Sequence, residues 1–74
     1  MLGFNRRKLQ AQMVLKGVTG KDVAKKIGVT EPTLYRKMNN NGDFTRNQIG
    51  MMIEFLDITD IDGIFFADDV AETQ

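Results

Sequence analysis

The 74-residue sequence contains no cysteine and no histidine, and it has a single proline. Without the first two residue types, the chain cannot form a disulfide, a thiol nucleophile, an imidazole acid–base group or a zinc site of the Cys/His type. It also lacks an apolar run near the roughly 18 residues that a membrane-spanning helix needs. We therefore expect a soluble cytoplasmic protein that has no metal site and no membrane contact.

The length and composition indicate one small globular domain. The chain is 42% hydrophobic and 27% charged, a balance typical of folded proteins. A chain this short cannot support two independent cores. We expect a single domain over residues 1–74, with its core at about residues 5–66 and an acidic, frayed tail at 67–74.

Positive charge is absent from the second part of the chain. All ten basic residues lie between Arg6 and Arg46 together with only three acids, so residues 1–46 carry a formal charge of +7. Residues 47–74 contain seven acids and no base, which gives −7. This asymmetry favours a polyanion as the partner of the first part. The alternative is that the two parts pack against each other and their charges cancel.

Threonines, glycines and the proline divide the sequence into five predicted helices. No stretch alternates polar and apolar residues in the manner of a strand. The first three helices are expected over about residues 5–16, 20–27 and 31–39, and the other two follow Thr45 and Thr59. The fold class is therefore all-α, a compact bundle of five short helices.

The helix ends and the core positions follow from local signals. Glycines 17 and 28 stand where a left-handed residue would end the first two helices, and Thr30 precedes the third as an N-cap. A threonine with an acid or amide three residues later, typical of a capping box, occurs as Thr19 with Asp22, Thr45 with Gln48 and Thr59 with Asp62. The apolar spacing predicts a core of Leu9, Met13, Val23, Ala24, Ile27, Leu34, Met38, Ile49, Met52, Ile53, Leu56, Ile61, Ile64 and Phe65.

The most informative segment is the turn at residues 28–30 between two short helices. Two short helices joined by three residues, with a glycine first, are typical of a helix-turn-helix, whose second helix enters the DNA major groove. Ala24 is small enough for the second helix to approach closely, Val29 supplies an apolar side chain from the turn, and Leu34 anchors the second helix.

The segment Val18-Thr19-Gly20-Lys21-Asp22-Val23-Ala24-Lys25-Lys26-Ile27-Gly28-Val29-Thr30 resembles the motif of lambda-repressor-like (XRE-type) DNA-binding domains. The segments Thr33–Asn39 and Asp43–Arg46 are similar to those of small phage repressor and Cro-like proteins in this family. The resemblance covers roughly residues 5–66. It implies five helices with the helix-turn-helix in the second and third, and a homodimer on a pseudo-palindromic operator in double-stranded DNA. It implies no cofactor and no small-molecule ligand, and a location in the bacterial cytoplasm or in the host cell of a phage.

The sequence departs from the family at two places. The family commonly begins the second helix with a glutamine that contacts a phosphate, whereas this chain has Gly20, followed by Lys21. Many members also bury an arginine of the first helix against a glutamate of the third, and the matching positions here are Met13 and Met38. Because an apolar pair of fitting shape can replace a buried ion pair, we expect these two methionines to touch.

The resemblance and the chemistry of the side chains predict three sets of site residues. Arg36 can make a bidentate contact to guanine, and Glu31 either accepts a hydrogen bond from cytosine or stabilises the start of its helix. The predicted base-reading residues are Thr30, Glu31, Pro32, Tyr35 and Arg36. The predicted phosphate contacts are Lys21, Lys37, Asn39, Asn41 and Arg46. Phe66 is assigned either to a two-fold dimer interface or to the core.

These observations favour a sequence-specific DNA-binding transcriptional regulator that inserts the helix Glu31–Asn39 into the major groove. The rival hypothesis is a helix-turn-helix module that binds a partner protein, as an adaptor or antirepressor, through its acidic C-terminal part. An enzyme is not expected. The acids of that part read as helix caps and a solvated tail, and their spacing does not match an EF-hand loop.

Overall fold

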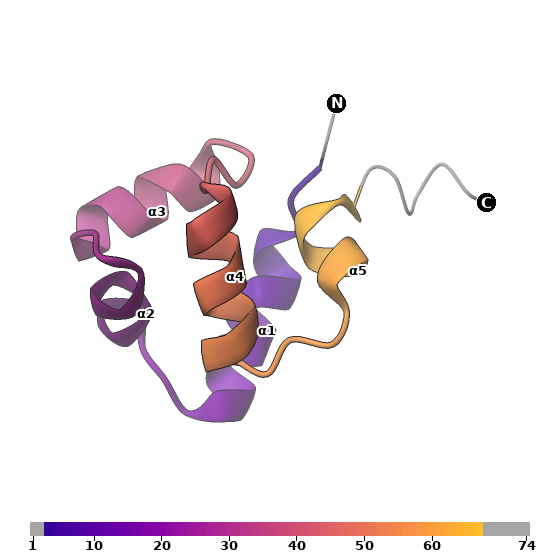
Figure 1. Ribbon diagram of the computed structural model, residues 1–74, viewed down its shortest axis with the longest axis horizontal. Coiled ribbons are helices and arrows are strands. Elements are labelled where there is room, and N and C mark those ends of the chain that lie inside the picture. The colour runs from indigo at the N-terminus through magenta and orange to yellow at the C-terminus, as the bar shows by residue number, and fades with distance from the viewer. Residues whose placement is uncertain (1–2, 68–74) are drawn as a thin grey trace.

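Five α-helices make up most of residues 3–67, the part of the chain that the computed structural model describes (Figure 1). They are α1 (Arg6–Lys16), α2 (Gly20–Ile27), α3 (Glu31–Asn39), α4 (Arg46–Phe55) and α5 (Ile61–Phe65). No strand occurs within these residues, so the predicted all-α architecture of five helices is confirmed. None of the helices between residues 3 and 67 has the length and apolar character required to cross a membrane.

The predicted caps of the second, third and fourth helices are present. Thr19 and Thr45 form complete capping boxes with the residues three positions later, and the Thr30 hydroxyl accepts a hydrogen bond from the Thr33 amide at 3.3 Å. The two predicted glycine ends are also present, because Gly17 and Gly28 adopt left-handed φ values of 69° and 82°. Local sequence signals therefore fix both ends of α2 and the start of α3.

The fifth helix begins differently from the prediction. Its N-cap is Asp60, not Thr59: one oxygen of the Asp60 carboxylate accepts a hydrogen bond from the Gly63 amide at 3.1 Å. The other oxygen accepts from the Lys8 ammonium group at 3.1 Å, which ties the start of α5 to α1. As a result the helix starts at Ile61, whose side chain is 37% exposed, so its predicted place in the core is wrong.

The core is formed by apolar side chains from all of the helices and from the loop before α5. Leu34 and Met38 are buried in α3, as predicted, and Met13 lies in the same core as Met38. Val29 of the turn between α2 and α3 is partly buried against it. The fully described core consists of Leu9, Met13, Val23, Ala24, Ile27, Leu34, Met38, Met52, Leu56, Ile58, Ile64 and Phe65, with Ile49 and Ile53 partly buried beside them.

The N-terminal segment is part of the packed structure. Phe4 lies beside Phe44 and Phe65, with ring centroids 5.8 and 5.9 Å away. The Asn5 amide donates to the Ile64 carbonyl at 2.7 Å, and the Ala67 amide donates to the Gly3 carbonyl at 3.1 Å. Ala67, which was assigned to the frayed tail, is therefore bonded to the N-terminal segment. The rest of that predicted tail, residues 68–74, lies outside the described residues.

Candidate nucleic-acid interface

Helix α3 has one buried face and one exposed polar face. Leu34 and Met38 are four residues apart and point into the core, with 0% and 2% of their surface exposed. The residues on the other side of the helix are therefore turned to solvent. Four of the five predicted base-reading residues are exposed, namely Thr30, Glu31, Pro32 and Arg36, and Asn39 at the end of the helix is exposed as well.

Tyr35, the fifth predicted base-reading residue, is only half exposed because it lies against the start of α2. A Cβ atom added to Gly20 would overlap the Tyr35 hydroxyl oxygen and would lie 2.8 Å from Cζ of the ring. The absence of a side chain at Gly20 thus makes room for the tip of Tyr35. The glycine at position 20 therefore has a structural reason in the contact between α2 and α3.

Thr30 has a defined role at the start of α3. Its hydroxyl oxygen caps the helix by accepting from the Thr33 amide, and the same hydroxyl donates to the Thr33 hydroxyl oxygen at 2.9 Å. Glu31 occupies the first turn, where a negative charge favours the helix dipole. Both residues are therefore placed at the exposed end of α3 by helix chemistry, whatever they contact outside the protein.

The loop after α3 contains Asn40 and Asn41, and the side chain of Lys37 is hydrogen-bonded to its backbone. The Lys37 ammonium group donates to the Asp43 carbonyl at 3.0 Å, so this side chain lies along the loop. Asn41 and Gly42 adopt consecutive left-handed conformations, with φ of 56° and 71°, which turn the chain sharply between α3 and α4. A shallow pocket at this corner is lined by Arg36, Lys37, Asn39, Asn40 and Asp43.

Two further predicted phosphate contacts stand at helix starts. Lys21 is in the first turn of α2, and Arg46 is the first residue of α4; both are exposed. The first turn of a helix presents N–H groups that suit an anion, and a basic side chain there adds positive charge. In Figure 1, α3, the loop that follows it and the first turn of α4 lie toward the upper side of the molecule.

The charge separation of the sequence is only partly cancelled in the fold. Lys8 pairs with Asp60 and Lys16 with Asp57, and these are the only ion pairs of basic residues within residues 3–67. Both pairs join α1 to the acidic C-terminal part. The lysine hydrogen bond, together with the Gly63 amide, lowers the pKa of Asp60. The basic residues of α2, α3 and the first turn of α4 form no ion pair in the described part of the chain.

Of the two positions predicted for Phe66, a dimer interface or the core, the structure favours the core. Phe66, the candidate dimer residue, is partly buried against the core. The largest exposed apolar side chains of residues 3–67 are instead Val14 and Leu15 on α1, at 79% and 75% exposure. The exposure of Val14 and Leu15 could have been predicted from the sequence, because they fall outside the helix face that Leu9 and Met13 define at a spacing of four residues.

Within residues 3–67, no group of three or more carboxylates is placed to hold a metal ion. Comparisons of the chain with protein-family models, with curated proteins and with solved structures gave no significant match.

Proposed function

We propose that the protein is a sequence-specific DNA-binding transcriptional regulator of the phage repressor or Cro type, with α2 and α3 as a lambda-repressor-like helix-turn-helix. The observation that supports this most directly is the exposed polar face of α3, opposite the buried Leu34 and Met38. Around it lie basic residues that form no ion pair within residues 3–67, whereas the lysines that do pair, Lys8 and Lys16, are on α1.

In this proposal α3 enters the major groove and its first turns read bases. Arg36 makes a bidentate contact to guanine, Glu31 accepts from a cytosine amino group, and Pro32 contacts a thymine methyl group. Lys21 and Arg46 bind phosphates on either side of the groove, with Asn39, Asn41 and Lys37 at the loop. The hydroxyl of Tyr35 lies where the family's glutamine side chain would start, so we assign Tyr35 a phosphate contact at the start of α2.

The biological setting belongs to the same proposal. A homodimer would bind a pseudo-palindromic operator and block promoter elements in the cytoplasm of a bacterium or of a phage-infected cell. The acidic C-terminal part would face away from the DNA, where it avoids repulsion from phosphates.

Selection from a randomised duplex pool tests this proposal, followed by titration of the selected duplex at several salt concentrations. Arg36→Ala should weaken binding to the selected sequence by about 1–3 kcal/mol and leave binding to unrelated duplex nearly unchanged. Lys21→Ala is the matched control, because it should weaken both and lower the slope of log K against log salt by about 0.9. Absence of any selected sequence, or a slope near zero for the wild-type protein, would refute DNA binding.

A second candidate function is a protein-interaction module, and the exposure of Val14 and Leu15 favours it. Two neighbouring apolar side chains on a helix surface are a suitable centre for a protein contact. Under this hypothesis Arg36→Ala leaves the partner complex intact, and Leu15→Gln weakens it. The opposite pattern, lost DNA binding with Arg36→Ala and no effect of Leu15→Gln, supports the DNA-binding function.

A further inference from the structure

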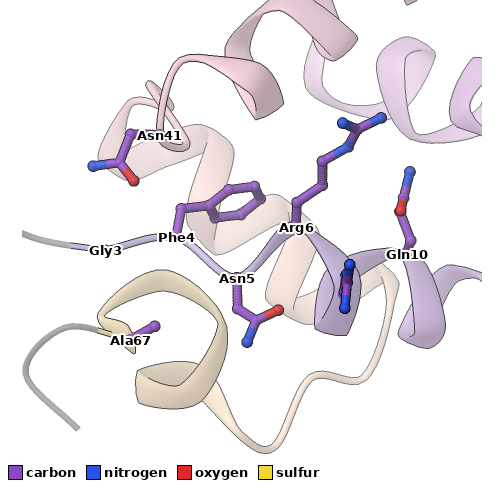
Figure 2. A pocket seen from close by; sticks show the side chains of 8 residues that line it. Gly3, Phe4, Asn5, Arg6, Gln10, Asn41 and Ala67 are labelled. Atoms are coloured by element: carbon purple, nitrogen blue, oxygen red, sulfur yellow. The ribbon is translucent and has the colours of Figure 1, made fainter. Parts of the chain in front are cut away.

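The first turn of α1 and the loop between α3 and α4 enclose a polar pocket (Figure 2). Its charged and polar lining includes Arg6, Arg7, Gln10 and Asn41. Arg6 and Gln10 are one helical turn apart, and Figure 2 shows their side chains extending from α1 in the same direction. Arg7 also lines the pocket, whereas Asn41 lies across Phe4 from Arg6 with its side chain extending away from it (Figure 2).

The position of this pocket is fixed by packing at its base. The Phe4 side chain fills the space beside Gly42, where an added Cβ would lie 2.7 Å from the Cβ of Phe4. The ring of Phe4 also meets Phe44 edge to face, and the Asn5 amide is held by the Ile64 carbonyl. The start of α1 is therefore anchored against the loop that follows α3. Both lie toward the same side of the molecule as α3 (Figure 1).

The two arginines of this pocket differ from the lysines of the same helix in their ion pairing. Arg6 and Arg7 are exposed, and neither forms an ion pair within residues 3–67, whereas Lys8 and Lys16 of the same helix do. The first turn of α1 contains no acid. Positive charge at a helix N-terminus opposes the helix dipole, so these side chains do not stabilise α1. Within residues 3–67 their charge is not matched by an acid, so it can attract an anion.

We propose that this pocket binds a phosphate group of the DNA backbone, as a contact additional to those of α2, α3 and α4. A guanidinium group presents parallel N–H donors that match two phosphate oxygens, and the Gln10 amide adds a donor one turn further along α1. The contact extends the interface from the helix pair to the first turn of α1. This inference rests on the proposed DNA binding and adds a site that DNA binding by α3 does not require.

The test compares two double variants, each of which removes two positive charges. Arg6→Gln with Arg7→Gln alters the pocket. Lys8→Gln with Lys16→Gln is the matched control, because these lysines of the same helix are paired with Asp60 and Asp57 of the C-terminal part. For each, the affinity for one fixed duplex is measured at several salt concentrations. The pocket variant should reduce the magnitude of the slope of log K against log salt by about 0.9 for each phosphate contact that is lost. Each lost contact corresponds to a loss of affinity of about eightfold at 0.1 M salt. The control should keep the wild-type slope.

A thermal melt of each variant separates binding from folding. The pocket variant should melt no lower than the wild type, because it removes charge that opposes the helix dipole. An unchanged slope in the pocket variant, with normal wild-type binding, overturns this site and leaves the proposed function standing. A wild-type protein that binds no duplex overturns both. A third outcome is that inorganic phosphate, added at constant ionic strength, shifts the amide NMR signals of Arg6 and Gln10 while the pocket variant keeps the wild-type salt slope. That result overturns the DNA contact and assigns the pocket to a free anion instead.

Discussion

Replacing Gly20 with alanine should force apart the contact between α2 and α3. Gly20 is buried, and a Cβ there would overlap the Tyr35 hydroxyl oxygen and lie 2.8 and 3.3 Å from Cζ and Cε2 of the ring. Ordinary contacts between such atoms are about 3.5–4.0 Å. The tip of the Tyr35 ring must therefore move away from α2 when alanine is introduced.

Two opposing effects set the size of the change. Forcing an extra methyl group into a packed position costs about 1–3 kcal/mol. Alanine is favoured over glycine in a helix by about 1 kcal/mol. The net expectation is a loss of between about 0 and 2 kcal/mol in the free energy of unfolding, with the steric part dependent on Tyr35 alone.

A double-mutant cycle with Tyr35→Ala isolates that steric part, and urea denaturation measures it. In the Tyr35→Ala background, Gly20→Ala should be neutral or stabilising by up to about 1 kcal/mol, so the coupling energy is about 1–3 kcal/mol. Gly50→Ala is the control, because an added Cβ at this exposed position in α4 meets nothing within 4 Å. If Gly20→Ala changes the free energy of unfolding equally in both backgrounds, Tyr35 does not cause the steric cost of a methyl group at position 20.

Two further predictions concern the core and the capping boxes. Leu34→Ala removes a fully buried side chain from α3 and should lower the free energy of unfolding by about 2–5 kcal/mol in urea denaturation, whereas truncation of the exposed Leu15 to alanine should change it little. A loss below about 1 kcal/mol for Leu34→Ala would contradict the burial of α3. Acidification should also destabilise the protein through Asp22, because its hydrogen bonds from the Thr19 amide and hydroxyl lower the pKa of the folded carboxyl group. The stabilisation is present above the unfolded pKa of about 3.9 and is lost as the pH falls through the folded value. Asp22→Asn should remove this part of the pH dependence of the melting temperature, and an identical acid profile in wild type and variant would exclude the effect.

The parts of the structure that the sequence predicts are those that depend on neighbouring residues. Thr19 caps α2 through contacts that all lie within four residues, and Gly28 ends the same helix through its own backbone conformation. The spacing of four residues between Leu34 and Met38 likewise determines which face of α3 is buried. Thr30, Glu31, Pro32 and Arg36 are accordingly exposed on the opposite face, whereas Tyr35 is partly buried against α2, and what these residues bind is still a proposal.

Most of the contacts that were not predicted depend on residues that are distant in the chain. Asp60 rather than Thr59 caps α5, and its second oxygen is held by Lys8, 52 residues away. The overlap of Tyr35 with the space at Gly20 depends on the approach of two helices. The pattern of neighbouring residues in the sequence does not predict how closely these two helices approach each other.

The sequence by itself determined the number of helices, the limits of the first three and the start of the fourth, because caps and apolar spacing act over three to seven residues. It also determined that all of the basic residues lie in the first part of the chain. Only the tertiary structure decided which of these charges remain available. It pairs Lys8 and Lys16 with acids of the C-terminal part, whereas Arg6 and Arg7, beside the loop after α3, form no ion pair within residues 3–67. The physical reason is that ion pairing depends on distance in space, whereas the sequence reports only distance along the chain.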